Sequence, residues 1–260
     1  MRLSVFASVI VISSSAIGQT MTPQSNSVAD VFLSRDIIAT FVVASSNSDV
    51  AHVYNEARSI ERFSPASTFK IPNTLIALDT HVVDSKDTVF KWDGTDKGLP
   101  QWNSDQTLGS AFKVSCVWCY QEIAREVGGE KYESVLAQIA YGNHSTRRRV
   151  DLFWLNGVLL ISADEQIEFL RKLYSHELPF HDEHVDVLKD IMLVEKNANY
   201  SLYAKTGWAI TTPQVAWYVG FIESGSQTWF FAMNMQVDRK EQVGLRKELA
   251  IASLQALGII

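Results

Sequence analysis

The chain has 260 residues, 47% of them hydrophobic, and a formal net charge of −6. This mildly acidic balance argues against nucleic acid or an anionic membrane surface as a partner, since both require a basic footprint. The length and apolar content suffice for a sizeable core, and no Pro/Gly/Ser-rich linker or repeat divides the sequence, so we expect a single domain.

Residues 1–18 have the pattern of a secretory signal peptide. Arg2 precedes an apolar stretch at residues 5–12, and the small residues Ala16 and Gly18 are placed like a cleavage site. The stretch is short for a membrane span, so we expect cleavage after Gly18 rather than a retained anchor. The domain would then be residues 19–260, and the loss of Arg2 would change the net charge from −6 to −7.

The first predicted element of the domain is a β-hairpin. Residues 37–44 are rich in β-branched and aromatic side chains, a polar turn follows, and residues 50–54 continue in the same style. Alternating apolar runs joined by a turn of small polar residues are typical of antiparallel strands.

The central motif is Ser-Thr-Phe-Lys, which begins at Ser67 and ends at Lys70. A serine and a lysine three residues apart lie on one face of a helical turn, so the amine can reach the hydroxyl and accept its proton. Ser64 and Pro65 predict the helix start, as a capping residue and a first helical position. Ser67 would then lie in the first turn, whose unpaired N–H groups favour an alkoxide.

Ser-x-x-Lys alone is a weak signal, because a second copy runs from Ser110 to Lys113. Taken alone, either copy is more typical of a helix surface pair than of a catalytic pair. Pro72, just after the first copy, predicts a tight or kinked first turn, because proline lacks an N–H and clashes with the carbonyl four residues back.

Cys116 and Cys119 are the only cysteines. At i and i+3 of a helix their Cα atoms would lie about 5 to 5.5 Å apart, within the disulfide range, and an exported protein meets an oxidising compartment. Regular helix geometry orients the Cβ vectors poorly for a bridge, so two buried free thiols are an equally good interpretation. The Cys-x-x-Cys spacing also suggests a thioredoxin-like oxidoreductase, which would need a parallel βαβ context.

The middle of the chain is predicted to be mostly helical, at residues 120–127, 163–174 and 184–193. The segment 181–186 contains two histidines and three acidic residues, which are residue types that bind metals. A solvated helix N-terminus explains the acidic residues more simply, and we expect no catalytic metal.

The last third predicts a second hairpin at residues 215–222 and 228–235, apolar on nearly every residue, so both of its faces should be covered. An amphipathic helix at 245–257 follows. We therefore expect a mixed α+β fold, with an antiparallel sheet built from both chain ends and a helical lobe inserted between them. A catalytic cleft would lie between sheet and lobe.

Lys205-Thr206-Gly207 immediately precedes this second hairpin. Its cation and hydroxyl suit a carboxylate, and its glycine would let a substrate approach the strand edge, although a turn at a strand start is the simpler interpretation of the triplet alone. Together, the Ser67 motif and this triplet are the signature of β-lactamases and penicillin-binding proteins.

Three middle motifs narrow the class: Ser115-Cys116-Val117, Tyr141-Gly142-Asn143 and Phe153-Trp154-Leu155. With these, the chain resembles the class D (oxacillinase-type) serine β-lactamases over essentially its whole mature length. The resemblance implies a β-lactamase/transpeptidase-like fold and a periplasmic enzyme that hydrolyses penicillin-type β-lactams and confers resistance. It implies no cofactor other than carbon dioxide, no nucleic acid partner, no membrane association after signal cleavage, and no particular oligomeric state.

The resemblance also implies roles for individual residues. Ser67 would be the acylated nucleophile, and Lys70, N-carboxylated as a carbamate, the general base. The remaining roles are Ser115 as proton relay, Trp154 as donor to the carbamate, the N–H groups of Ser67 and Trp208 as oxyanion hole, Lys205, Thr206, Gly207, Arg246 and Val117 as substrate-binding residues, and Tyr141, Gly142 and Asn143 as residues that shape the cleft.

Two departures from the family pattern matter. The segment 208–213 is short and lacks glycines that many relatives carry, so the substrate spectrum does not transfer. The cysteines beside Ser115 are unusual for the family. A β-lactam-binding sensor, which shares fold and motifs but acylates without turnover, is a further alternative. Such sensors follow several membrane spans, whereas only a cleavable signal is expected here.

Overall fold

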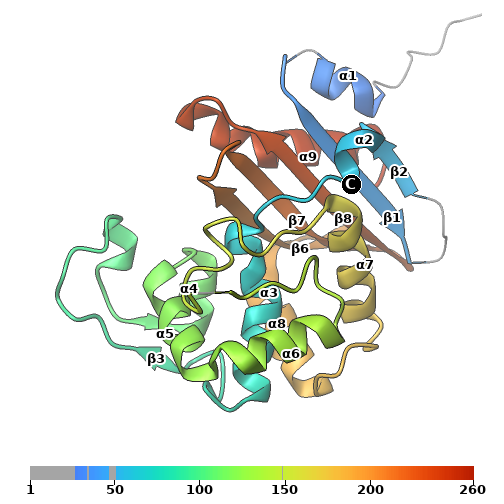
Figure 1. Cartoon of the computed structure of the whole chain (residues 1–260). Helices are drawn as coiled ribbons and strands as arrows, with labels where there is room; N and C mark the ends of the chain where they lie inside the picture. Colours follow the sequence, from blue (N-terminus) through green and yellow to red (C-terminus); the bar gives the residue numbers. More distant parts are fainter. Residues whose placement is uncertain (1–26, 34, 47–50, 148) are drawn as a thin grey trace, which may run out of the picture.

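The computed structural model describes residues 27–33, 35–46, 51–147 and 149–260. The expected signal peptide lies outside these ranges. The described residues form an antiparallel sheet with helices on both faces, and a largely helical lobe packs below the sheet in Figure 1. The predicted mixed α+β fold is confirmed.

The main sheet has six strands in the order β2-β1-β8-β7-β6-β5, and each neighbouring pair is antiparallel. Both predicted hairpins are present, and β1 pairs with β8, which joins the two ends of the chain in one sheet. The strands are β1 (Ala39–Ser45), β2 (Ala51–Tyr54), β5 (Leu193–Lys196), β6 (Tyr200–Ala209), β7 (Val215–Ser224) and β8 (Gln227–Gln236), and a separate two-stranded sheet contains β3 (Val89–Phe90) and β4 (Gln106–Thr107).

The helices follow the sequence pattern closely where the pattern is long. Helix α7 has the predicted bounds, α9 ends one residue early, α8 begins two residues early, and α5 begins three residues before the predicted start. The helices are α1 (Val28–Leu33), α2 (Glu56–Ser59), α3 (Lys70–Asp79), α4 (Leu108–Lys113), α5 (Val117–Val127), α6 (Gly129–Gln138), α7 (Ala163–Tyr174), α8 (Asp182–Met192) and α9 (Leu245–Ala256), with 3-10 turns η1 (Ala66–Phe69), η2 (Pro100–Trp102) and η3 (Lys240–Gly244).

The sheet separates two apolar clusters. Alternate residues of each strand point to opposite faces, so Val219 and Phe221 of β7 join the cluster shared with the helical lobe, whereas Tyr218 joins the cluster under α1 and α9. Strand β7 is buried at eight successive positions, as expected for a strand covered on both faces. The lobe cluster is the larger of the two and contains the first turns of α3.

Strand β6 was not predicted as a strand. It is ten residues long and contains Lys205-Thr206-Gly207 in its interior rather than at a strand start. Strand β5 pairs only with residues 201–203, so the rest of this edge of β6 is left for the site described below.

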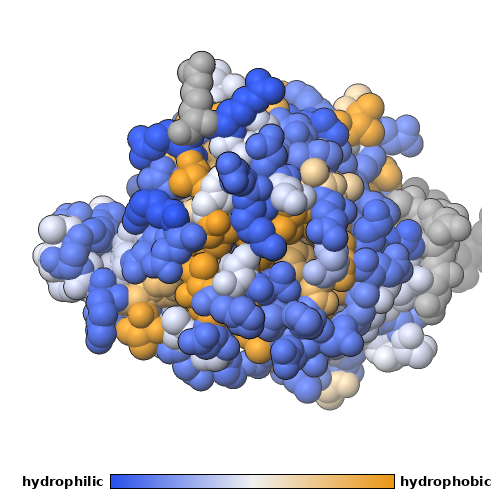
Figure 2. Space-filling model, turned by 60° about the horizontal axis from the view of Figure 1, so that its bottom comes forward, coloured by the Kyte–Doolittle hydropathy of each residue, from blue (hydrophilic) through white to orange (hydrophobic). Residues whose placement is uncertain are grey.

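The surface of the face shown in Figure 2 is mainly hydrophilic, with apolar residues gathered near its centre. Within the part of the chain that the structure describes, no helix is long and apolar enough to cross a membrane.

Candidate active site

Ser67 lies in the 3-10 turn η1, directly before α3. It is the only residue from Phe63 to Leu78 that is not buried, so the turn presents one side chain to the surface of an otherwise enclosed segment. Its neighbour Ala66 has φ 47°, in the left-handed region that residues other than glycine rarely occupy. Such local strain is kept where the surroundings enforce it, which is common at functional sites.

The predicted tight turn at the start of α3 is therefore confirmed, but its predicted cap is wrong. Pro65 is the N-cap residue of η1 and makes no side-chain capping bond. The hydroxyl of Ser64 instead donates to the carbonyl oxygen of Trp154 at 2.9 Å, and the N–H of Ala66 donates to the same carbonyl at 3.0 Å. A contact distant in the sequence thus replaces the local cap and ties the nucleophile turn to residue 154.

Lys70 is the first residue of α3 and is 1% exposed. Its Nζ has no hydrogen-bond partner among the described residues. Burial lowers the pKa of Lys70 to about 7, because a desolvated ammonium is disfavoured relative to the neutral amine. A lysine on the same helical turn as Ser67, neutral in a large fraction of molecules near pH 7, is suited to accept a proton.

Tyr120 completes the surroundings of Lys70 and was not predicted. The amine lies 4.4 Å from the centroid of the Tyr120 ring, and the Tyr120 hydroxyl bonds to the hydroxyl of Thr74 at 2.7 Å. The spacing of Tyr120, five residues after Ser115 on the predicted helix 120–127, is the only local signal for it. The contact itself joins α3 and α5, which the sequence does not place side by side.

Ser115 and Lys205 meet across the cleft between lobe and sheet. Ser115 lies in the short connection between α4 and α5, and its hydroxyl accepts a hydrogen bond from Nζ of Lys205 at 2.5 Å. Lys205 is 4% exposed, and burial, together with the positive charges of Lys70, Arg246 and Lys247, holds its pKa well below the usual range.

Gly207 has a different role from the predicted one. A Cβ at this position would lie 2.8 Å from the carbonyl oxygen of Pro65 and 3.3 Å from the backbone nitrogen of Thr68. The missing side chain is thus needed so that β6 can pack against the nucleophile turn, and the space that it leaves is filled by η1 rather than by substrate.

The two predicted tryptophans lie on either side of this turn. Trp154 is fully buried and stacks on Phe69 with ring centroids 5.6 Å apart. Trp208 lies in β6 next to Gly207, is half-buried, and donates its indole N–H to Gln214 at 3.2 Å. Val117 is the first residue of α5 and is half-buried.

Arg246 is the second residue of α9, and its Nη1 donates to the carbonyl oxygen of Val243 at 2.7 Å. Burial lowers its pKa to about 10, and its buried Nε has no partner in the described part of the chain. A cavity of about 300 Å³ opens beside this region, lined by Lys205, Thr206 and Lys247 among others. A second cavity, of about 210 Å³, lies between α7 and α8, away from Ser67.

Tyr141, Gly142 and Asn143 support the site from behind instead of lining an open cleft. Gln166 donates both to the Thr68 hydroxyl at 3.1 Å and to the Tyr141 hydroxyl at 3.4 Å, which connects Tyr141 to the nucleophile turn. Gly142 has φ 59°, and a Cβ there would meet the carbonyl oxygen of Leu160. Asn143 hydrogen-bonds residues 158 and 160.

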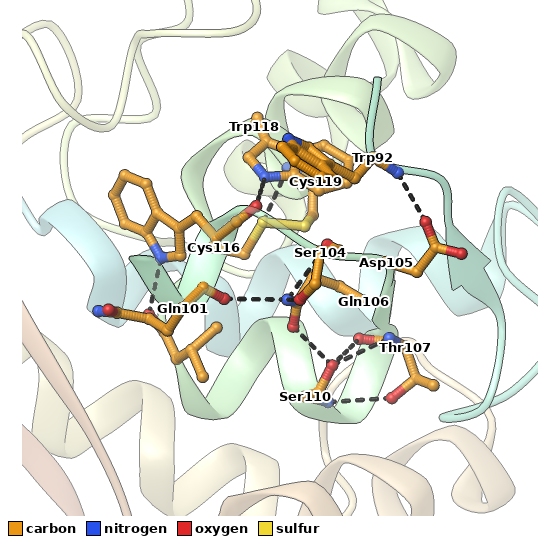
Figure 3. The surroundings of a disulfide bond; sticks show 12 residues. Trp92, Gln101, Ser104, Asp105, Gln106, Thr107, Ser110, Cys116, Trp118 and Cys119 are labelled. Atoms are coloured by element: carbon orange, nitrogen blue, oxygen red, sulfur yellow. Dashed lines mark hydrogen bonds between the residues drawn. A yellow bond between two sulfur atoms is a disulfide. The ribbon is translucent and has the colours of Figure 1, made fainter. Parts of the chain in front are cut away.

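Cys116 and Cys119 form a disulfide with Cα atoms 5.6 Å apart, which resolves the two sequence interpretations in favour of the bridge (Figure 3). The strand pairs of the described chain are antiparallel, so the parallel context of a thioredoxin-like oxidoreductase is contradicted.

The second Ser-x-x-Lys copy has a structural role at its serine. Ser110 forms a capping box with Thr107 at the start of α4 (Figure 3), whereas Lys113 is exposed. Within the described ranges, no three His, Cys, Asp or Glu side chains are grouped so that they could hold a metal ion, and Asp182 in the segment 181–186 begins α8.

Comparisons with known proteins match this architecture. The family model of the penicillin-binding protein transpeptidase domain matches residues 36–254. Beta-lactamase OXA-20 of Pseudomonas aeruginosa is 40% identical, with 99% of this chain and 97% of that protein covered. Beta-lactamase OXA-48 of Klebsiella pneumoniae is 42% identical, with 84% of this chain and 83% of that protein covered.

Solved structures agree with the sequence comparison. The class D beta-lactamase YbXI from Nostoc has a TM-score of 0.88 and 38% identity, covering 90% of this chain and 99% of that one. The class D beta-lactamase FUS-1 (OXA-85) from Fusobacterium nucleatum subsp. polymorphum has a TM-score of 0.87 and 36% identity, covering 90% of this chain and 98% of that one.

Proposed function

The chain belongs to the class D serine β-lactamases and is a hydrolase of the β-lactam amide, and we propose that it acts through an acyl-enzyme on Ser67 with Lys70 as general base. The observation that carries this assignment is the buried, unpartnered amine of Lys70 on the same turn as the one accessible side chain of its segment. Penicillin-type β-lactams are the proposed substrates, and resistance to them is the biological outcome.

In acylation, Lys70 accepts the proton of the Ser67 hydroxyl as Oγ forms a bond to the carbonyl carbon of the ring. The N–H groups of Ser67 and Trp208 are the proposed donors to the oxyanion, because β6 packs directly against the nucleophile turn. As the C–N bond breaks, Ser115 gives its proton to the ring nitrogen. The ammonium of Lys205, which already donates to the Ser115 oxygen, stabilises that transfer.

Deacylation needs a base on the same side, and Lys70 is proposed to serve there too. Its site fits a carbamate: the amine is dry, lacks a partner within the described chain, and lies on the turn of Phe69, whose ring stacks on Trp154. A carbamate, formed when the neutral amine adds to carbon dioxide and loses a proton, would supply an anionic base stronger than the amine in reach of water. The indole N–H of Trp154 is the proposed group that holds it.

Lys205, Thr206 and Arg246 are the proposed anchors for the substrate carboxylate. Arginine binds a carboxylate with charge-assisted and often paired hydrogen bonds, and the unpartnered Nε of Arg246 leaves capacity for one. Val117 and Gly207 are proposed to border the bound ring. We further propose that residues 1–18 direct export to the periplasm, and that neither nucleic acid nor a metal takes part.

The central pair is tested by intact mass spectrometry after incubation with a penicillin. Ser67→Ala should gain no drug mass, whereas Lys70→Ala should acylate slowly and then remain one drug mass heavier, because the base for the attacking water is missing. A Lys70→Ala enzyme that clears its adduct at the wild-type rate would assign the deacylation base to another residue. A sensor that does not turn over would instead retain the adduct in the wild type.

A further inference from the structure

The Cys116–Cys119 disulfide has no part in the proposed chemistry, yet the active-site residues surround it in the sequence. Ser115 precedes the bridge, Val117 lies within it, and Tyr120 follows it. We propose that this disulfide is a positioning device that holds the hydroxyl of Ser115 against Lys205, and that its reduction slows acylation. The proposal rests on the proposed role of Ser115 as proton relay.

Ser115 lies in a connection that leaves it little freedom. Helix α4 ends at Lys113 and α5 begins at Val117, so only three residues join them. Ser115 has φ 57°, a left-handed conformation that a residue with a side chain adopts only where its neighbours enforce it. Its own N–H donates to the Phe112 carbonyl at 3.2 Å, and the next N–H donates to Ala111 at 2.8 Å.

The bridge replaces an ordinary helix cap at the start of α5. Cys116 is the N-cap residue, and its sulfur accepts the N–H of Cys119 at 3.2 Å. Sulfur is a weak acceptor compared with the oxygens of Ser, Thr, Asp or Asn that usually occupy this position. The covalent bond between the same two residues therefore provides most of the restraint on the backbone that leaves Ser115.

Tryptophans hold the other flank of Ser115 and cover the bridge. The indole of Trp102 donates to the carbonyl of Val114 at 3.0 Å, and the indole of Trp118 donates to the carbonyl of Trp102 at 3.0 Å. Figure 3 shows Trp118 beside the bridge, and both cysteines are fully buried. With Val114 fixed on one side and Cys116 on the other, the Ser115 hydroxyl is held 2.5 Å from the Lys205 amine.

Reduction removes one of these two restraints. A small dithiol attacks one sulfur of the bridge and then resolves the mixed disulfide, so that the S–S bond breaks, both cysteines become thiols and the dithiol is oxidised to its own disulfide. The backbone at Cys116 is then held by the weak sulfur cap alone, and Ser115 can leave the conformation in which it faces Lys205.

The test measures acylation and deacylation separately, by quenched-flow mass spectrometry with a penicillin in single-turnover conditions. Enzyme reduced with dithiothreitol, shown by thiol alkylation to carry two free cysteines, should acylate about fivefold more slowly or worse, because a misplaced proton donor assists the C–N cleavage poorly. Deacylation should change by less than about twofold, because it depends on Lys70 and water. Reoxidation should restore the original acylation rate.

Variants separate the bond from the cap. Cys119→Ala removes the bridge but keeps the capping sulfur, and Cys116→Ser/Cys119→Ala restores an oxygen cap without a bridge. Both should acylate slowly and be insensitive to dithiothreitol, which controls for direct attack of the thiol on the drug. If either variant fails to fold, the reduced and reoxidised wild type still decides the question.

Ser115→Ala distinguishes the two ways in which the idea could fail. If it acylates at the wild-type rate, the proposed relay role of Ser115 is wrong. If it acylates slowly while the fully reduced wild type acylates at the oxidised rate, the disulfide does not position Ser115. A reduced enzyme whose acylation and deacylation rates fall in equal proportion would also overturn the proposal, since that result describes a general loosening of the fold.

Discussion

Three cations meet at the site, and each is desolvated. Burial lowers the pKa of Lys70 to about 7 and of Arg246 to about 10, and that of Lys205 lies well below its usual range. Within the described ranges, none of the three has a carboxylate within ion-pair distance. Unpaired buried charge is costly, so the arrangement favours an anionic ligand that supplies the missing counter-charge.

The pH dependence of the enzyme should follow from Lys70. Below about pH 7 its amine is protonated and can neither accept the Ser67 proton nor add to carbon dioxide, so the rate of hydrolysis should fall as the pH drops through that value. Above it, the neutral amine predominates and the rate should level off. Steady-state rates from pH 5.5 to 8.5 in degassed buffer, with and without bicarbonate, provide the measurement.

Bicarbonate should raise the rate at mildly acid pH and have little effect at the plateau. Equal rates with and without bicarbonate in degassed buffer would exclude the carbamate while leaving Ser67 as nucleophile.

Arg246→Ala should raise KM for penicillins by about 10- to 100-fold and lower kcat much less. A carboxylate anchor contributes similarly in the ground and transition states, and a charged hydrogen bond contributes about 1.5 to 3 kcal/mol. Arg35→Ala is a matched control, because it removes only an exposed contact between Arg35 and Glu248 on the same helix α9. An unchanged KM in Arg246→Ala would move the anchor to Lys205 and Thr206.

At the scale of elements, the sequence predicts what depends on local spacing. Ser67 and Lys70 share a turn because they are three residues apart, and α7 appears where its apolar period and its Ser162 capping box place it. Tyr120 beneath Lys70 and the link from Gln166 to Thr68 were not predictable in this way. Both join segments far apart in the chain, and only tertiary packing brings them together.

Strand β6 shows the same division. A glycine, a charged residue and a threonine in sequence are typical of a turn, and so Lys205-Thr206-Gly207 was read as the start of a strand. Its strand conformation is imposed by ten paired residues on β7. Pairing of this kind overrides local propensity.

Gly207→Ala should reduce kcat/KM by about 10-fold or more and destabilise the fold by about 1 to 3 kcal/mol. The added methyl would lie 2.8 Å from the Pro65 carbonyl, so β6 and the nucleophile turn must separate. Gly129→Ala, where a Cβ meets nothing within 4 Å, is the matched control and should leave both quantities unchanged. Denaturant unfolding and nitrocefin kinetics report the two effects, and wild-type kinetics in Gly207→Ala would mean that this contact yields without moving Ser67.

At the scale of the molecule, the sheet divides stability from catalysis. The cluster under α1 and α9 contains Phe41, Met233 and Leu254, whereas the lobe cluster contains Phe69, whose ring stacks on Trp154 beside the nucleophile turn. Both clusters are needed for folding, because a sheet with two apolar faces must be covered on each. Only the lobe cluster is in contact with catalytic residues.

Leu254→Ala and Phe69→Ala should therefore differ in kind. Each removes a fully buried side chain and should lower the free energy of unfolding by about 2 to 5 kcal/mol, measured in urea. Leu254→Ala lies across the sheet from Ser67, and at a temperature where it remains folded its kcat/KM should equal that of the wild type. Phe69→Ala removes the residue between Ser67 and Lys70 together with its stack on Trp154, and should lose activity as well as stability. A tenfold lower kcat/KM in folded Leu254→Ala would show that the outer cluster also sets the geometry of the site, because the sheet would then transmit a packing defect from one face to the other.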